Sequence, residues 1–421
     1  MKLQTQLGKN TLWVLSSRFG SQGLMVLFTI LIARRLGSDG FGEYAFIAAT
    51  IFLGNIVTTF GTDMLLIREI ASHDDLSRLF EALLIQLVLS GLFVVGVFFL
   101  APILPNQSPA AVLALQIYSL ALFPLAFFTV FTTALRGKQK MDAYTVLNLF
   151  VSSLQVALVW LFINPGSSIV ELAVLLLITQ VAAAVLAGLI CTLAIPRFWQ
   201  SWRFSISPIP AVVRLSAPMA LLGLLGILYQ KLAIYMLSFM RGAEVTGWFS
   251  AALRAVEASK IIHLAAFTTL YPAMAQVQAD LGSDDQSTGV FKWSWRLLLA
   301  TAFVVAIVLF LLAGPIVHFL YGNGYDPSVT GLRILTWTLV PYTVNTYLSL
   351  AYLATGGERW VMRVMSVGLI TLAVLEALLI PYWGLTGACL GVVIAETVQT
   401  AVYLYPRKDQ YQKVFKLFGG A

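Results

Sequence analysis

Long apolar segments follow one another along the whole chain, separated by short polar or turn-forming stretches. A helix of about 20 mostly apolar residues is long enough to cross a bilayer. The runs are continuous and do not alternate with polar residues, which favours helices over a β-barrel. Twelve segments meet this criterion, at approximately 11–33, 41–67, 80–101, 109–135, 142–163, 169–195, 212–240, 244–270, 294–320, 329–354, 361–382 and 385–405. The pattern therefore predicts an all-α membrane protein with twelve transmembrane helices.

The composition extends this prediction to the entire chain of 421 residues, which is 59% hydrophobic and only 11% charged. A soluble protein carries about 25% charged residues, so a soluble domain with one anchor is excluded. The first apolar run is too long for a cleaved signal segment and is expected to remain as a span. The two cysteines lie in apolar runs, and no cysteine or histidine spacing fits a metal site. We expect neither a cofactor nor a metal.

Lysine and arginine in the loops orient the predicted helices, because cytoplasmic loops are enriched in these residues. With the N-terminus in the cytoplasm, 18 of the 26 basic residues lie on the cytoplasmic side and four on the outer side. Both termini are therefore predicted to be cytoplasmic. The net charge of +7 follows from this topology and from contact with anionic membrane lipids. It gives no support to nucleic-acid binding.

An internal repeat relates the two halves of the chain. Residues 36–49 and 241–254 align at a constant offset that pairs Gly37 with Gly242, Gly42 with Gly247 and Tyr44 with Phe249. Each stretch joins the first and second spans of a six-span half. The predicted organisation is an N-terminal six-helix bundle (1–199), a cytoplasmic interfacial linker (200–211), a C-terminal six-helix bundle (212–405) and a basic cytoplasmic tail (406–421). Since each half has an even number of spans, we expect a pseudo-twofold axis along the membrane normal and a central cavity, an architecture typical of alternating access.

The two span junctions also carry a resemblance to a known family. The stretches ARRLGSDGFGEYAFIAA (33–49) and GTDMLLIREIA (61–71) resemble the start of the polysaccharide-transport (Wzx-type flippase) family, and residues 214–257 resemble the start of its second half. That family belongs to the multidrug/oligosaccharidyl-lipid/polysaccharide exporter superfamily. The resemblance implies a flippase that moves a polyprenyl-diphosphate-linked oligosaccharide from the inner to the outer leaflet of a bacterial plasma (inner) membrane. It also implies a link to polysaccharide polymerase machinery. Lipid II flippases of this superfamily carry basic residues in the first span, and Arg18 occupies a comparable place.

Charged residues inside the predicted spans mark the candidate substrate site, because a charge at the bilayer centre costs about 2.5–3.5 kcal/mol on insertion scales. The segment ALRAVEASKIIH (252–263) places Arg254, Glu257 and Lys260 in one sector of a helix, with the acid between the two bases. Lys231 and Arg18 add two more bases. We predict that the diphosphate binds to Arg18, Lys231, Arg254 and Lys260. The alternative is a structural salt-bridge triad that holds helices together.

The remaining polar residues inside spans give weaker candidates. The acids Asp63, Glu257, Glu376 and Glu396 are predicted to balance charge or to couple transport to H+ or Na+, or they are partners for polar groups on other helices. His263 is expected to be a satisfied interior histidine rather than a proton carrier. Sugar contacts are assigned to Gln22, Asn55, Tyr229 and Gln230. A hinge is assigned to Pro218, Gly223 and Gly226, with a static kink as the alternative.

Three functional classes compete for this sequence. The excess of bases over acids favours an anionic head group, and hence a lipid-linked oligosaccharide flippase. A small-molecule or multidrug antiporter of the same superfamily is the alternative, although a cation exporter is expected to show a net acidic cavity. A membrane enzyme requires a catalytic region outside the membrane, and the outer loops are too short to build one. The sequence therefore predicts a transporter without enzymatic activity.

Overall fold

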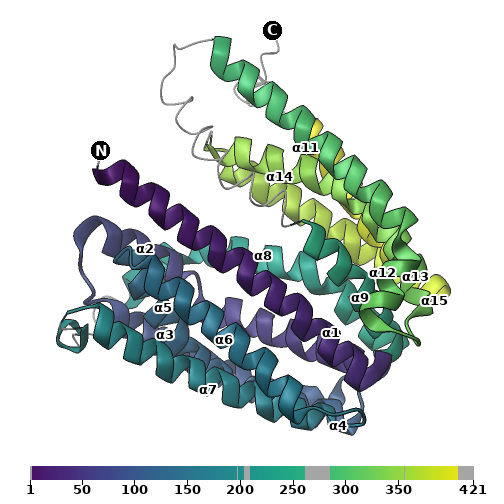
Figure 1. Ribbon diagram of the computed structural model, residues 1–421, viewed down its shortest axis with the longest axis horizontal. Helices are drawn as coiled ribbons and strands as arrows, with labels where there is room; N and C mark the ends of the chain where they lie inside the picture. The colour runs from purple at the N-terminus through teal and green to yellow at the C-terminus, as the bar shows by residue number, and fades with distance from the viewer. Residues whose placement is uncertain (1, 197, 203–208, 261–284, 355, 406–421) are drawn as a thin grey trace. The chain divides into compact units, whose positions relative to one another are not determined.

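The computed structural model describes the chain except for residues 1, 197, 203–208, 261–284, 355 and 406–421 (Figure 1). The part of the chain that is described forms helices and turns and contains no strand, which confirms the predicted all-α class. The helices are α1 (Lys2–Thr59), α2 (Thr62–His73), α3 (Leu79–Leu100), η1 (Ala101–Ile103), α4 (Pro109–Ser119), α5 (Leu122–Gly137), α6 (Met141–Phe162), α7 (Ile169–Ala194), η2 (Phe198–Ser201), α8 (Ile209–Arg241), α9 (Ala243–Ser259), α11 (Asp285–Leu311), α12 (Ala313–Tyr321), α13 (Asp326–Leu335), η3 (Thr336–Thr338), α14 (Leu339–Ala354) and α15 (Glu358–Leu404).

Eight helices in the described ranges are long and apolar enough to cross a membrane, so the chain is a multi-pass membrane protein. The longest are α1 and α15, with 58 and 47 residues, and each contains one glycine with a non-helical backbone. Gly37 has φ 72° and ψ −176°, and Gly384 has φ 51° and ψ −121°. Gly37 lies between the predicted spans 11–33 and 41–67, and Gly384 lies between the predicted spans 361–382 and 385–405. The count of twelve spans stays a prediction.

The break in α1 should depend on its glycine, because the backbone angles of Gly37 lie in a region that is essentially restricted to glycine. We expect Gly37→Ala to lower the free energy of unfolding by about 1–3 kcal/mol. Thermal unfolding of the detergent-solubilised protein measures the change. The control is Gly96→Ala within α3, where an added Cβ meets no atom within 4 Å. That change should be neutral or stabilising, since alanine favours a helix, and equal shifts for the two variants would contradict the prediction.

The described helices divide into two compact units. The first unit comprises Met1–Leu228 with Gly242–Glu244, and the second comprises Tyr229–Arg241 with Val245–Ala421. The division falls inside α8. The predicted linker overlaps the residues that are not described, and the predicted bundle limits and the pseudo-twofold axis stay predictions.

Helix packing in the first unit centres on α1, α5 and α7. Helix α1 packs along α6, and both α4 and α5 pack against α7 (Figure 1). A buried apolar cluster joins α2, α3, α5, α6 and α7, and it includes Ile70, Leu79, Phe131, Leu147 and Cys191. Phe198 of η2 closes this cluster, with its ring 5.9 Å from that of Phe131. Trp202, at the start of the predicted linker, packs beside Phe198 against the same cluster, with ring centres 5.7 Å apart.

The second unit is built around α14 and α15. Helix α14 packs against α15 and α11, and α13 packs against α12 and α15. Its core is aromatic: the rings of Trp295 and Tyr347 lie 4.8 Å apart, and those of Tyr352 and Tyr403 lie 5.9 Å apart. Both arms of α15, on either side of Gly384, therefore belong to the unit that carries most of the predicted charged site.

One arginine in each unit binds the carbonyl oxygens at the end of a long helical segment. Arg35 donates from Nη1 to the carbonyls of Val159, Trp160 and Ile163, where α6 ends. Arg241 donates to the carbonyls of Ile380 and Pro381, just before the break in α15. A cation at a helix C-terminus is stabilising because the terminal carbonyls lack helical partners. The repeat-paired glycines that follow both have positive φ, 72° at Gly37 and 82° at Gly242, which supports the predicted repeat.

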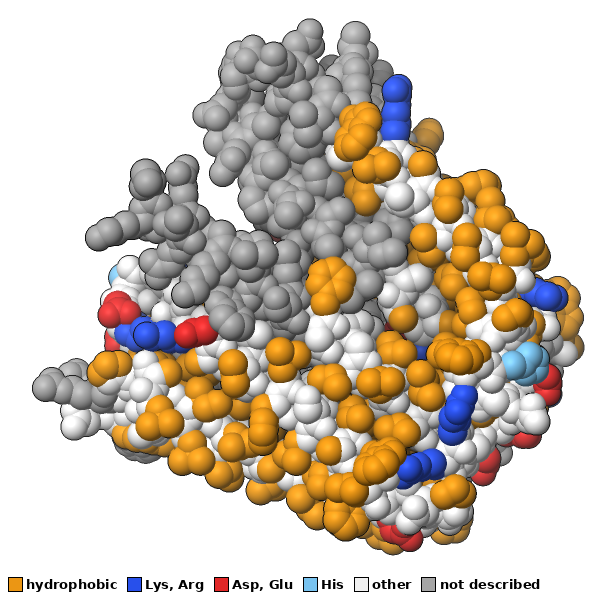
Figure 2. All heavy atoms as spheres, viewed as in Figure 1, with side chains coloured by type: hydrophobic (Ala, Val, Ile, Leu, Met, Phe, Trp, Pro, Cys, Tyr) orange, Lys and Arg blue, Asp and Glu red, His pale blue; other side chains and the backbone are white. Residues whose placement is uncertain are grey.

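Apolar side chains dominate the described surface. Figure 2 shows hydrophobic side chains spread over the visible face, with most charged side chains near its edges. Large side chains on α3 and α7 are exposed, including Leu92 (66%), Phe99 (76%) and Leu193 (87%). Such extensive exposed apolar surface is unusual in a soluble protein and fits contact with lipid.

Candidate functional site

Three of the four predicted diphosphate-binding bases lie together in the second unit, around Glu257. Arg254 and Glu257 form an ion pair on α9, with Nη1 and Oε2 3.0 Å apart. Lys231 of α8 is only 6% exposed, and both it and Lys260 interact electrostatically with Glu257. We call Lys231, Arg254, Glu257 and Lys260 the basic cluster.

The basic cluster is partly open. The side chains of Arg254 and Glu257 are 24% and 26% exposed. Tyr321 of α12 closes one side by donating from its hydroxyl to the carbonyl of Ala251 at 3.1 Å. Arg254 and Glu257 are thus partly exposed, and both the diphosphate site and the structural salt bridge stay predictions.

Helices α14 and α15 add residues to the cluster that the sequence did not reveal. The ammonium group of Lys260 lies 4.1 Å from the centre of the Tyr342 ring, a cation–π contact. Lys260 also interacts electrostatically with Glu396 of α15. Tyr342 was missed because a tyrosine in an apolar run carries no signal of the helix opposite to it. With Glu396 nearby, the local excess of bases is smaller than the sequence predicted.

Asn345 holds Glu396 in place. Its Nδ2 donates to Glu396 Oε2 at 2.7 Å and to the backbone carbonyl of Glu396 at 3.0 Å. Thr400 donates to Asn345 Oδ1 at 2.8 Å, which fixes the orientation of the amide. All three side chains are buried or half-buried. This network fixes the position of the Glu396 carboxylate between α14 and α15.

Glu376 is the least exposed acid among the described side chains of the second unit. It is 0% exposed, and neither carboxyl oxygen has a hydrogen-bond partner among the described residues. It lies on the first arm of α15, close to the second arm, since a Cβ on Gly391 would be 3.2 Å from Glu376 Cγ. The hydroxyl of Tyr229 interacts electrostatically with both Glu376 and Glu396. A buried acid without a partner is costly and is typical of an ion- or proton-binding position.

The other predicted site residues lie elsewhere. Arg18 lies in α1 of the first unit, and its side chain falls outside the described ones. Gln22, Asn55 and Asp63 are half-buried in that unit, and no ion pair joins Asp63 to Arg68 among the residues with described side chains. Gln230 is exposed, whereas its neighbour Tyr229 reaches the acids. His263 lies outside the described residues.

The predicted hinge lies in the first unit's part of α8. Pro218 is inside this helix, where it removes one backbone hydrogen bond. A Cβ on Gly223 would lie 3.3 Å from Ile56 Cγ2, so close packing of α8 on α1 also accounts for that glycine. Gly226 is in the same helix. Bending at these residues stays a prediction.

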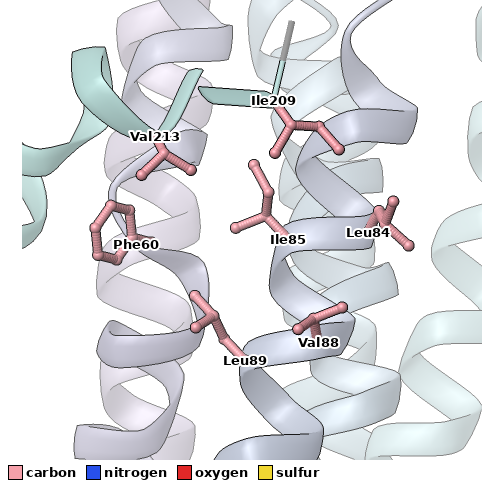
Figure 3. A pocket seen from close by; sticks show the side chains of 7 residues that line it. All are labelled: Phe60, Leu84, Ile85, Val88, Leu89, Ile209 and Val213. Atoms are coloured by element: carbon pink, nitrogen blue, oxygen red, sulfur yellow. The ribbon is translucent and has the colours of Figure 1, made fainter. Parts of the chain in front are cut away.

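An apolar pocket of about 310 Å³ lies in the first unit, between the turn that follows α1, helix α3 and the start of α8 (Figure 3). Figure 3 shows apolar side chains around it, contributed by Phe60, Leu84, Ile85, Val88, Leu89, Ile209 and Val213. The pocket offers no polar group to a ligand. No group of three or more metal-ligating side chains occurs in the part of the chain that was searched.

Comparison with protein families separates the two transporter classes from the enzyme class. A family model described as "Polysaccharide biosynthesis protein" matches residues 7–278, more than half of the chain. The chain belongs to this family. A second model, "Lipid II flippase MurJ", matches residues 238–418. These matches confirm the resemblance seen in the sequence, and they place the polysaccharide biosynthesis protein among flippases and transporters rather than enzymes. No curated relative matches the sequence.

Solved structures show that this family member has the fold of the same transporter superfamily. An inward-facing multidrug resistance MATE transporter is 15% identical, with a TM-score of 0.74 over 95% of this chain and 96% of that one. The inward closed lipid II flippase MurJ is 14% identical, with a TM-score of 0.71 over 97% and 90%. A transporter from Pyrococcus furiosus, described as having a binding pocket of reverse polarity, is 15% identical, with a TM-score of 0.67 over 98% and 96%. At these identities the likeness concerns the fold.

Proposed function

We propose that the protein flips a polyprenyl-diphosphate-linked oligosaccharide, a polysaccharide repeat unit, from the inner to the outer leaflet of a bacterial plasma membrane. The basic cluster is the observation that carries the proposal. Its three bases and one acid, of which Arg254 and Glu257 are partly exposed, suit an anionic head group. The family match supports the same conclusion.

The diphosphate would bind by replacing protein carboxylates as partners of the bases. Arg254 pairs with Glu257, and Lys260 lies near Glu396. A diphosphate offers more oxygens and more negative charge than either carboxylate, and charge-assisted bonds to arginine are strong and directional. Arg18 of the first bundle would complete the site when the two bundles close on the substrate.

Transport would follow alternating access by two six-helix bundles with cytoplasmic termini. The inward-open state takes the diphosphate and glycan, while the polyprenyl tail stays partly in lipid between the bundles. Rocking of the bundles, with bending at Pro218, Gly223 and Gly226, would open the site outward. The released lipid-linked glycan would then reach polysaccharide polymerase machinery.

A proton or sodium ion would reset the cycle through Glu396 and Glu376. Glu396 lies near Lys260, so neutralising its charge would leave the lysine free to attract the diphosphate. Glu376 has no partner of its own among the described groups and is available to an incoming cation. Substrate and ion would thereby act on one electrostatic network. The membrane potential alone is the simpler alternative.

A multidrug antiporter is the second candidate, and the buried acids favour it. Glu376 and Glu396 are both largely enclosed, and an enclosed carboxylate attracts an organic cation as well as a small ion. The similarity of fold to MATE transporters is compatible with this function. The three bases of the basic cluster argue for the flippase, because they repel a cation.

Reconstitution into proteoliposomes tests the proposal. The substrate is a polyprenyl diphosphate bearing a disaccharide with an NBD label, and added dithionite quenches only the label in the outer leaflet. We expect the protein to expose the inner-leaflet label, and not that of NBD-phosphatidylcholine. Ethidium, driven by a proton or sodium gradient, tests the antiporter. Movement of ethidium without movement of the diphosphate would replace the flippase by the second candidate.

A further inference from the structure

A second pocket of the second unit lies away from the basic cluster, at the break in α15. It is open, has a volume of about 400 Å³ and is lined by four segments: the end of α8, the start of α9, the start of α13 and the turn at Gly384. Its main polar and aromatic side chains are Arg241, Trp248, Thr330, Tyr382, Trp383 and Thr386. Ligand pockets commonly range from about 300 to 1,000 Å³, so this one has room for one or two sugar rings.

The pocket is held in shape by bonds that do not involve a ligand. Arg241 binds the carbonyls of Ile380 and Pro381, which anchors the arm of α15 that precedes the turn. Gly384 has the angles of the first central residue of a type II′ turn, φ 51° and ψ −121°, which favour glycine. Trp248 donates from Nε1 to the carbonyl of Gly324 at 3.0 Å, and Ser328 donates to the carbonyl of Trp248 at 2.9 Å. The walls are therefore formed before anything binds.

The exposed groups of this pocket match a sugar. Tyr382 and Trp383 are 82% and 58% exposed, so broad aromatic faces are available for the C–H face of a pyranose ring. Thr330 is exposed and Thr386 is half-buried, and their hydroxyls both donate and accept hydrogen bonds. No carboxylate lines the pocket. The guanidinium of Arg241, the one charged group among the lining residues, already donates to the carbonyls of Ile380 and Pro381. Aromatic faces combined with neutral hydroxyls therefore suit an uncharged glycan.

The topology predicted from the sequence puts this pocket on the outer side of the membrane. Arg241 is among the few basic residues assigned to that side, and the turn at Gly384 joins two spans there. We propose that this pocket binds neutral sugar units of the transported oligosaccharide as they emerge, an inference that rests on the proposed function. The glycan would thus be held by aromatic stacking at the exit, separately from the diphosphate.

Binding of simple sugars to the full-length protein in lipid nanodiscs tests the inference. The probes are the methyl glycosides of glucose, galactose, mannose and N-acetylglucosamine, and saturation-transfer NMR reports which protons contact the protein. We expect saturable binding of at least one glycoside, weakened by about tenfold in Trp383→Ala through loss of the stacking face. Thr330→Val, a change of similar shape at an exposed position, should also weaken binding and serves as the second variant.

The matched control is Trp160→Ala at the end of α6. Trp160 is 59% exposed, almost the same as Trp383, and it also lies at a helix end capped by an arginine. If these tryptophans only anchor the protein at the membrane interface, the two alanine variants will behave alike, and the inference is overturned. Absence of saturable binding by any of the four glycosides also overturns it.

The flipping assay and the glycoside-binding assay distinguish failure of the flippase proposal from failure of the sugar-pocket proposal. If the wild-type protein does not move the labelled diphosphate probe but still binds a methyl glycoside through Trp383, the pocket stands and the proposed function falls. If the diphosphate probe moves while glycoside binding is indifferent to Trp383→Ala and Thr330→Val, the function stands and the pocket assignment falls.

Discussion

Replacing both Arg254 and Lys260 by alanine should reduce flipping of the labelled diphosphate probe by at least about 100-fold, because two charge-assisted contacts of about 1.5–3 kcal/mol each are lost. Arg254 is paired with Glu257 and remains partly exposed, and Lys260 links Glu257 to Glu396. Dithionite quenching in proteoliposomes measures the rate. The variant should still insert, since Glu257 keeps Lys231 as a neighbour.

A double variant of the same residue types is the control for the loss of two ion-paired bases. Arg78 pairs with Glu69 and Lys138 pairs with Asp74, both in the first unit and outside the basic cluster. Arg78→Ala with Lys138→Ala should leave the flipping rate within about twofold, since surface ion pairs contribute about 0–1 kcal/mol. The exchange Arg254→Lys with Lys260→Arg should retain most of the activity. Normal flipping by the double alanine variant of the cluster would remove the diphosphate assignment.

Two substitutions of Glu376 are expected to distinguish its effect on the stability of the protein from its effect on the coupling of flipping to an ion gradient. Glu376→Leu should raise the free energy of unfolding by about 1–3 kcal/mol, because a buried carboxyl without hydrogen-bond partners is replaced by an apolar side chain of similar size. Glu376→Gln should abolish the acceleration of flipping by an imposed proton or sodium gradient. Thermal unfolding measures the first effect, and flipping rates with and without a gradient measure the second.

Glu81 provides the matched control for Glu376. It is 3% exposed in α3 of the first unit, and its Oε2 also lacks a hydrogen-bond partner in the described structure. Glu81→Gln should leave the gradient dependence unchanged, since Glu81 lies in the first unit, whereas Glu396 and the basic cluster lie in the second. A loss of stability in Glu376→Leu, together with an intact gradient response in Glu376→Gln, would make this acid a structural residue.

Much of the architecture could be predicted from the sequence because the bilayer imposes a simple length rule. The predicted spans 142–163, 169–195 and 212–240 correspond closely to α6, α7 and α8. The predicted gaps near Gly37 and Gly384 are the breaks inside α1 and α15. Finer divisions were not predicted: the span 41–67 is interrupted at Phe60 and Gly61, both with positive φ, and the span 109–135 is divided into α4 and α5. Such interruptions depend on packing rather than on hydrophobicity.

The candidate site was predictable only in part. The charges of α9 stand out in the sequence because each is expensive in a membrane, and helical periodicity places Arg254, Glu257 and Lys260 in one sector. Tyr342 and Glu396, which interact with Lys260, lie about 85 and 140 residues further along the chain. Asn345 and Tyr342 carry no such signal, since a polar or aromatic residue inside a span is compatible with many environments. The pocket beside Gly384 was missed for the same reason: its walls come from four segments that are distant in the sequence.

The sequence by itself determined that this chain is an all-α, multi-pass membrane protein of the polysaccharide biosynthesis family, and that Arg254, Glu257 and Lys260 share one helix face. These properties depend on hydrophobic length, helical periodicity and local motifs, which are written in consecutive residues. The tertiary structure decided that Lys231 joins this face, that Asn345 orients Glu396, and that Glu376 is enclosed without a hydrogen-bond partner in the described part of the chain. Contacts between helices set these environments, because the cost of a buried charge depends on the groups that neighbouring helices bring to it.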